Sequence, residues 1–306
     1  MAALRWPWQR RQTPPPPRYA STISSFGEST FAELAWQRAR AATRRWAFAG
    51  AAIGALIGLV AFAPASWLAA AVASASGGQL LLAEARGTVW NGSAIAVLTG
   101  GEGSRDAASL PGRIEWAIGW RGAGPLLRIS QSCCVRTPLA IALKPGLGRL
   151  QFLVAPPAGL PADAPLGRWP AAWLAGLGTP WNTMQLGGEL RVRTPGLSIE
   201  WVRGRWIVGG RVELELLDVS SRLSTIEPLG SYRLTVVGDP ANPGTSTLAL
   251  ATLNGALLLS GNGSLGSAGL RFRGEASAAP ADEAALNNLL NIIGRRSGAR
   301  SIIAIG

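Results

Sequence analysis

The sequence predicts a mainly β protein, in which a single N-terminal transmembrane helix precedes an antiparallel β domain and a short C-terminal helix. Three observations predict this fold class. Residues 46–63 form an apolar run without a charged residue, apolar residues alternate with a period of two from about residue 77, and helical spacing returns after Pro280. We expect the β domain to form one extended or curved sheet from two weakly duplicated units.

The apolar run predicts a membrane anchor. At about 1.5 Å per residue the run reaches roughly 27 Å, close to the thickness of a bilayer's hydrocarbon core. Residues 1–45 hold eight arginines against two acidic residues, and basic flanks stay in the cytoplasm. We therefore expect a cytoplasmic Pro/Arg-rich tail at 1–45, a transmembrane anchor at 46–73 and a periplasmic β domain at 77–306. The chain would be a single-pass protein of a bacterial inner membrane.

A cleaved secretory signal is the alternative, because the small residues from Ala71 to Ala75 resemble a cleavage site. A signal's apolar region spans about 7–15 residues behind a short basic segment, so the longer run favours an uncleaved anchor. Within the run Gly50, Gly54 and Gly58 fall on one helix face. Such a stripe lets a second helix approach closely in lipid. It predicts a helix–helix contact, with a homo-oligomer as one form.

The composition excludes several classes of site. The chain has no histidine, which removes the usual general base and the commonest metal ligand. Its two cysteines, Cys133 and Cys134, are adjacent, so they form a vicinal disulfide or present one thiol to each face of a strand. Half of the net charge of +12 lies in the tail, and no nucleic-acid recognition motif accompanies it. We expect no catalytic residue, metal, cofactor or nucleic-acid partner.

Short alternating segments separated by Gly, Pro, Asn and Asp predict the sheet. Between Arg211 and Leu217, for example, Val212, Leu214 and Leu216 share one face and the acidic residues share the other. The predicted strands are Ser93–Thr99, Arg113–Trp120, Leu139–Leu143, Gly188–Arg193, Val212–Leu217, Tyr232–Val237, Thr247–Leu253, Ala256–Ser260 and Leu270–Ala276.

The C-terminal helix is predicted between Pro280 and Arg296. Pro280 suits its start, Asp282 and Glu283 suit its first turn, and Arg295 with Arg296 suits its last. One face, which we expect to pack against the sheet, then holds Leu286, Leu289, Leu290 and Ile293.

Three further patterns have ordinary structural explanations. Gly261–Gly266 matches G-x-G-x-x-G, but another alternating run follows it in place of a helix, so we expect a hairpin turn. Glu213 and Glu215 share a strand face and are expected to be solvated, not a catalytic pair. Most tryptophans of the β domain are expected in its core, with some lining an apolar groove or partner surface. They are Trp90, Trp116, Trp120, Trp169, Trp173, Trp181, Trp201 and Trp206.

A weak duplication supports the two related units. Gly87-Thr-Val-Trp-Asn-Gly92 and Gly178-Thr-Pro-Trp-Asn-Thr183 each precede a predicted strand, and an Ile-Glu-Trp tripeptide follows each one, at 114–116 and 199–201. Two related β units would extend a sheet by repetition.

These segments also carry a resemblance. Together with Leu110–Trp116, Ser220–Leu234 and Leu286–Arg296 they cover most of residues 80–306, and they resemble the type II secretion system protein N family. The resemblance implies a non-catalytic inner-membrane component of the machine that exports folded periplasmic proteins across the outer membrane. It implies other type II secretion components, in the inner membrane or periplasm, as partners. The long tail and the Cys133-Cys134 segment depart from the family pattern.

A lipid-handling protein is the alternative function. A long antiparallel sheet behind one inner-membrane helix is similar to AsmA-type proteins, whose curved sheets shelter acyl chains in an apolar groove. Membrane lipid is therefore also an expected partner. A continuous groove at least one acyl chain long and lined by apolar side chains would favour this alternative, whereas a filled sandwich core would exclude it. An envelope hydrolase, a third class, has no supporting motif.

Overall fold

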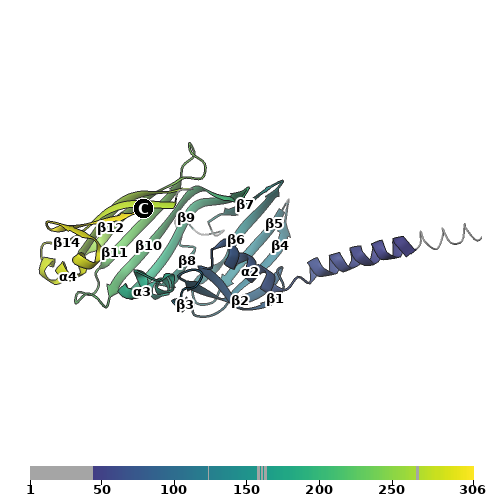
Figure 1. Cartoon of the computed structure of the whole chain (residues 1–306), viewed down its shortest axis with the longest axis horizontal. Helices are drawn as coiled ribbons and strands as arrows, with labels where there is room; N and C mark the ends of the chain where they lie inside the picture. Colours follow the sequence, from purple (N-terminus) through teal and green to yellow (C-terminus); the bar gives the residue numbers. More distant parts are fainter. Residues whose placement is uncertain (1–43, 123, 157–158, 160, 162–163, 267–268) are drawn as a thin grey trace, which may run out of the picture. The chain divides into compact units, whose positions relative to one another are not determined.

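The computed structural model describes residues 44–122, 124–156, 159, 161, 164–266 and 269–306. The chain divides into two units, Met1–Leu59 and Val60–Gly306. A helix over Arg44–Ala61 crosses this boundary (Figure 1). Within the described part of the chain it is the one helix long and apolar enough to cross a membrane, and none of its residues is buried. Of the predicted tail, only Arg44 and Arg45 lie within the described residues.

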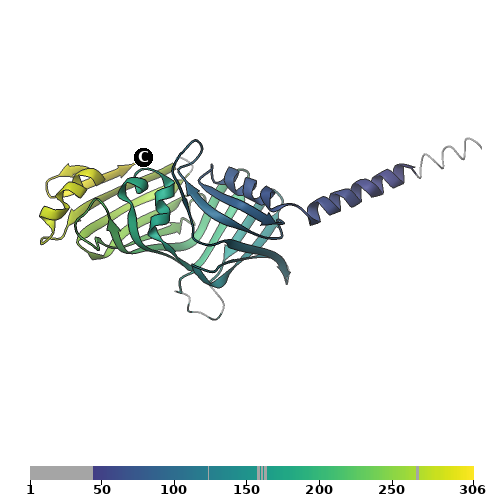
Figure 2. The same ribbon diagram turned by 90° about the horizontal axis from the view of Figure 1, so that it is seen from below.

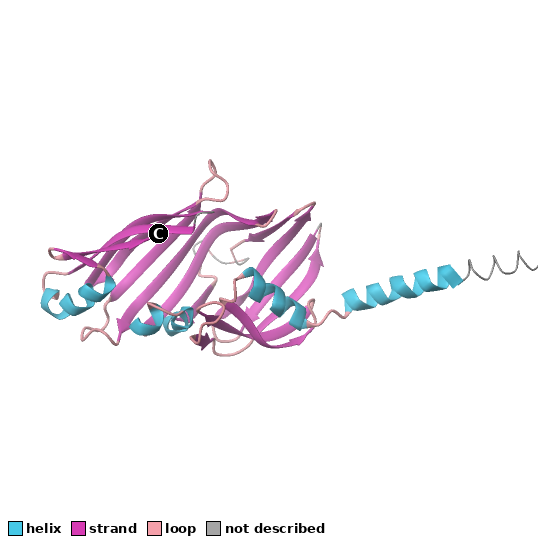
Figure 3. Cartoon of the chain, viewed as in Figure 1, coloured by secondary structure: helices cyan, strands magenta, loops and turns pink. Residues whose placement is uncertain are grey.

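One antiparallel sheet of 16 strands forms the second unit (Figures 1 and 3). Its order is β1-β2-β4-β5-β6-β7-β9-β10-β11-β12-β13-β14-β16-β15, with β3 beside β2 and β8 beside β9. Most strands therefore pair with their neighbours in the chain. The bounds are β1 Leu80–Gly87, β2 Asn91–Thr99, β3 Ala107–Ser109, β4 Ile114–Arg121, β5 Gly124–Gln131, β6 Val135–Gly146, β7 Arg149–Val154, β8 Gly167–Pro170, β9 Leu186–Val202, β10 Arg205–Ser221, β11 Gly230–Gly238, β12 Ser246–Gly255, β13 Leu257–Gly266, β14 Gly269–Ala278, β15 Arg295–Ser297 and β16 Arg300–Ile305. The predicted mainly β class with one large antiparallel sheet is confirmed.

Short helices pack on one face of this sheet (Figure 2). They are α2 (Ala65–Ala75), η1 (Ala171–Leu177), α3 (Trp181–Met184) and α4 (Glu283–Ile293). Under α4, η1 and α3 lies the larger core, in which Leu286, Leu289 and Leu290 of α4 pack with Leu257 and Ala276 of the sheet. A smaller core joins Ala65 of α2 to Ala94 and Trp116. The predicted C-terminal helix and its buried leucine face are confirmed.

Two local predictions were wrong. Arg295 and Arg296 do not close α4, because Gly294 is extended (φ −165°, ψ −176°) and the two arginines begin β15, which pairs with β16. Gly261–Gly266 is not a hairpin turn, because these residues form the second half of β13 and pair with β14 along their whole length. In both places the cross-strand pairing decides the conformation, which local sequence does not show.

The two Trp-Asn motifs differ in local structure. Residues 87–92 form the turn and first residues of the β1–β2 hairpin, whereas Trp181 and Asn182 begin α3. Each motif still precedes a strand, β2 in the first case and β9 in the second.

The segment predicted as the anchor, residues 46–73, holds parts of two helices. The first ends at Ala61, Pro64 precedes α2, and Ala65 is 1% exposed against the sheet. Since the backbone N–H of Val89 also donates to the carbonyl of Ala63 (2.9 Å), the chain is bound to the sheet from Ala63 onward. The extent of the membrane-spanning segment stays a prediction.

Candidate functional site

The two faces of the sheet differ sharply in charge. Alternate side chains of a strand point to opposite faces, and directly paired residues share a face. We call the face that carries the helices the inner face, which holds Leu214, Leu234 and Leu250 in one cross-strand row. Outside the bulge at Asp218, the charged residues of strands β5–β14 all fall on the outer face. They are Arg128, Arg136, Lys144, Arg149, Arg168, Glu189, Arg191, Arg193, Glu200, Arg205, Arg211, Glu213, Glu215, Arg233, Arg271, Arg273 and Glu275.

Much of the inner face is apolar but lies outside both helix-covered cores. The helices cover the end of the strands at which β14 leads into α4, and the opposite end carries the β4–β5, β6–β7 and β9–β10 turns. We call the apolar residues toward that opposite end the uncovered face; each is half-buried or exposed. They are Ile118, Trp120, Ile141, Leu143, Leu150, Phe152, Ile199, Trp201, Trp206, Val208, Val212, Leu214, Leu234, Val236, Leu248, Leu265, Leu270, Phe272 and Ile305.

Three tryptophans of this face are exposed. Trp120 is 79% exposed, Trp206 46% and Trp201 40%. The rings of Trp206 and Phe152 lie 6.4 Å apart across the intervening strand β9. The prediction that most tryptophans of the domain lie in its core was wrong, since Trp116 alone of the eight is fully buried. That some of them line a groove or a partner surface stays a prediction.

Glycines flatten the C-terminal part of the uncovered face. A Cβ at Gly261 would lie 2.4 Å from the ring of Phe272, and one at Gly274 would lie 2.9 Å from it. The ring therefore rests on the backbone of two glycines, and larger residues there would push it away. The alternation of glycine in β13 thus shapes this surface and does not form a nucleotide-binding loop.

The outer face holds the carboxylates in ion pairs. Glu215 is 3% exposed and contacts Arg233 (2.8 Å) and Arg193 (3.3 Å), while Glu213 contacts Arg211 (2.6 Å). The expectation that Glu213 and Glu215 are simply solvated was wrong, because cross-strand pairing puts arginines opposite them. Both carboxylates are therefore engaged by arginines of the sheet.

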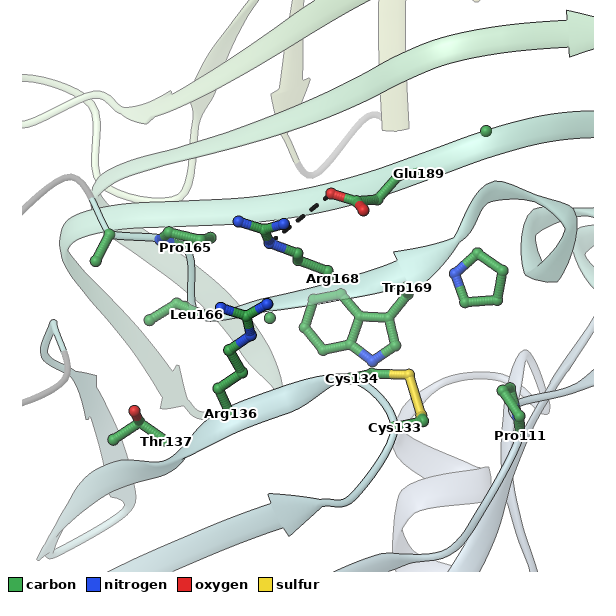
Figure 4. Close-up of a pocket in the computed structure, with 14 residues that line it drawn as sticks. Pro111, Cys133, Cys134, Arg136, Thr137, Pro165, Leu166, Arg168, Trp169 and Glu189 are labelled. Carbon is green, nitrogen blue, oxygen red and sulfur yellow. Dashed lines mark ion pairs between the residues drawn. A yellow bond between two sulfur atoms is a disulfide. The ribbon is translucent and has the colours of Figure 1, made fainter.

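A cleft of about 700 Å³ lies between the β5–β6 turn and β8 (Figure 4). Cys133 and Cys134 line it and are disulfide-bonded to each other, which answers the question that the sequence left open. Arg136 and Arg168 reach into the cleft, and Arg168 contacts Glu189 (3.9 Å). Among the described residues, the charged ones that line the cleft are Arg136, Arg168 and Glu189.

The first Trp-Asn motif joins the sheet to the chain that leaves the apolar helix. Trp90 Nε1–H donates to the carbonyl of Val60 (2.7 Å), next to the contact of Val89 with Ala63. Trp116 lies under this turn, and its Nε1–H donates to the carbonyl of Val89 (3.1 Å). The motif therefore ties the chain at the end of the helix Arg44–Ala61 to the sheet by hydrogen bonds.

Metal chemistry has no support in the described part of the chain. No group of three or more His, Cys, Asp or Glu side chains there is placed to hold a metal ion.

Comparison with known protein families identifies the family of this chain. A family model described as type II secretion system (T2SS), protein N, matches residues 78–303. The chain belongs to this family. The match begins just before β1 and ends within β16, so it covers the sheet and leaves out the apolar helix and α2. No curated protein and no solved structure matches the chain.

Family membership makes the chain a component of a secretion machinery, a class that is generally non-catalytic, and implies association with other components of that system. The resemblance drawn from the Trp-Asn motifs and from the Ser220–Leu234 segment is confirmed. The structure gives those residues structural roles: Trp90 and Trp116 clamp the helix exit, and Tyr232 donates a buried hydrogen bond to the carbonyl of Leu257 (3.0 Å).

Proposed function

We propose that the chain is a non-catalytic inner-membrane component of the type II secretion system that supports export of folded periplasmic proteins across the outer membrane. The family match over residues 78–303 carries this proposal. The carboxylates of Glu213 and Glu215 are held by arginines on the outer face, which supports a structural role for this pair over a catalytic one.

The proposal includes a topology. Residues 1–45 lie in the cytoplasm, residues 46–61 of the helix Arg44–Ala61 belong to the predicted anchor at 46–73, and residues 77–306 lie in the periplasm. The basic flank supports this orientation, and the Cys133–Cys134 disulfide suits an oxidising compartment. Protease added to spheroplasts should digest the sheet domain and leave a tag at the N-terminus protected. Digestion of the N-terminal tag in place of the sheet domain would reverse the orientation.

Two features suit the proposed partners. The sheet ends at β1 on one side and at β15 on the other, and such edges can accept a strand from another secretion component. The stripe of Gly50, Gly54 and Gly58 offers a contact to a second membrane helix, because a Cβ at any of the three meets nothing within 4 Å in the chain itself.

The test is deletion of the gene in its native host, with restoration of the full chain in trans. We expect enzymes that are normally secreted to accumulate in the periplasm and to reappear outside when the chain is restored. A variant in which a cleavable signal replaces residues 1–62 tests whether the anchor is needed. Unchanged secretion in the deletion strain, with no secretion component among crosslinked neighbours of the chain, would reject the proposal.

A further inference from the structure

We propose that the uncovered face binds the acyl chains of phospholipids taken from the membrane in which the helix Arg44–Ala61 resides. This inference goes beyond the role in export and does not depend on it. It rests on the polarity of the sheet, the exposure of its inner face, the dimensions of that face and its connection to the helix.

The polarity and exposure of the uncovered face indicate the chemistry of its ligand. This face carries no charged side chain, whereas the opposite face carries arginines and glutamates on most of the same strands. Several of its side chains remain exposed: Trp120 is 79% exposed, Ile305 48% and Trp206 46%. Large contiguous apolar surfaces are rare on soluble domains and mark places that another apolar body covers. A ligand for this face must be a hydrocarbon with few polar atoms.

The face is long enough for whole acyl chains. From β4 to β16 the strand order contains ten inter-strand steps, which at about 4.8 Å each span roughly 50 Å. The hydrocarbon core of a bilayer is about 30 Å thick, so the acyl chains of one leaflet reach about 15 Å. Several chains therefore fit along the sheet.

The connection to the helix indicates where the lipid comes from. Trp90 Nε1–H donates to the carbonyl of Val60, at the end of the apolar helix, and the carbonyl of Trp90 accepts from the backbone N–H of Ile118 (2.6 Å). Ile118 and Trp120 are the first residues of the uncovered face along the sheet. Two hydrogen bonds thus join Val60, where the apolar helix ends, to the first strand of this face, which supports membrane lipid as the source of the acyl chains.

A protein partner suits this surface less well. Interfaces between proteins surround their apolar centre with polar groups that fix orientation, and this face offers few such groups over its length. A second copy of the chain, packed face to face, would bury the same residues. The test therefore separates the two occupants.

The experiment uses the full chain in vesicles of phosphatidylethanolamine and phosphatidylglycerol in which the phosphatidylethanolamine carries a photoreactive group at the end of one acyl chain. After illumination, mass spectrometry maps the adducts. We expect adducts on inner-face residues of β7, β9, β10 and β11, far along the strand order from the helix. Adducts confined to the helix Arg44–Ala61 and its immediate flanks would overturn the proposal.

A matched pair of variants on β11 gives the control. Val236→Asp places a charge on the uncovered face, whereas Val237→Asp places the same charge on the outer face of the same strand. We expect at least a tenfold fall in adduct yield on β9–β11 with Val236→Asp and no change with Val237→Asp, at equal far-ultraviolet circular dichroism. Equal yields in the two variants, or chain-to-chain crosslinks between inner-face residues in place of lipid adducts, would overturn the proposal. If Val236→Asp does not fold, the wild-type adduct map decides alone.

Discussion

The packing of α4 on the sheet yields a quantitative prediction. Leu286 is completely buried between α4 and the sheet, while Ile292 on the same helix is 54% exposed. Leu286→Ala removes three buried carbons, worth about 2.4 kcal/mol at ~0.8 kcal/mol per CH₂. The cavity left behind raises the expected loss to about 3–4 kcal/mol.

Ile292→Ala is the control on the same helix. About half of its side chain is already in water, so the transfer loss is roughly 1 kcal/mol. The better helix propensity of alanine returns about 0.4 kcal/mol of that loss. The expected net effect is about 0.5 kcal/mol, several times smaller than that of Leu286→Ala.

Urea unfolding of the full chain in detergent micelles, followed by tryptophan fluorescence, measures the difference. With a slope of about 2.5 kcal/mol per molar urea, Leu286→Ala should lower the midpoint by roughly 1–1.5 M and Ile292→Ala by about 0.2 M. Equal midpoints for the two variants would refute the reasoning, because they would mean that α4 is not docked through its leucine face.

Three shorter predictions concern other parts of the chain. Burial raises the pKa of Tyr232 above its ordinary value of 10.0, so the unfolded chain loses this proton first and stability should fall as the pH rises above about 10. In Tyr232→Phe the fall in stability between pH 8 and pH 10.5, measured by unfolding titrations, should disappear. The same substitution should lower stability at pH 8 by about 1 kcal/mol, because the hydrogen bond of the hydroxyl is lost. Glu215→Gln should destabilise the chain by about 1–2 kcal/mol and Glu213→Gln by less, since their side chains are 3% and 20% exposed; equal losses in urea unfolding would contradict this. Gly54→Leu should weaken self-association of the chain in vesicles, measured by energy transfer, whereas Ala52→Leu on another helix face should not. Equal effects of the two substitutions would show that the glycine stripe is not the contact between helices.

The sequence predicted the sheet well where a strand alternates without interruption and poorly where it is bulged. Strand β10 runs over 17 residues, yet only Val212–Leu217 was predicted. Gly209 and Gly210 precede the predicted segment, and Gly210 (φ +81°) lies next to Arg211, where the register with β9 shifts. A glycine inside a strand often marks such a bulge. The strand continues on both sides of it because β9 supplies the partner, which local sequence does not reveal.

The uncovered face was beyond sequence reasoning for a different reason. Trp116 and Trp120 lie four residues apart on the same face of β4, so the alternation of apolar residues predicts the same burial for both. Trp116 is 5% exposed because it packs with Ala65 of α2, whereas Trp120 is 79% exposed. Periodicity shows which face of a strand is apolar. Which part of that face a helix covers depends on where the helix ends, and that is a tertiary property.

The exposed area of three tryptophans gives an estimate of the free energy that would be released if this face were covered. A tryptophan carries about 150–250 Å² of surface, so exposures of 79%, 46% and 40% at Trp120, Trp206 and Trp201 leave on the order of 300 Å² in water. At about 25 cal/mol per Å², burying these three rings yields roughly 8 kcal/mol before the entropy of binding is subtracted. A domain's whole stability is about 5–15 kcal/mol. An apolar surface of this size is therefore expected to be occupied in the native setting, and loss of its occupant should lower the stability of the sheet.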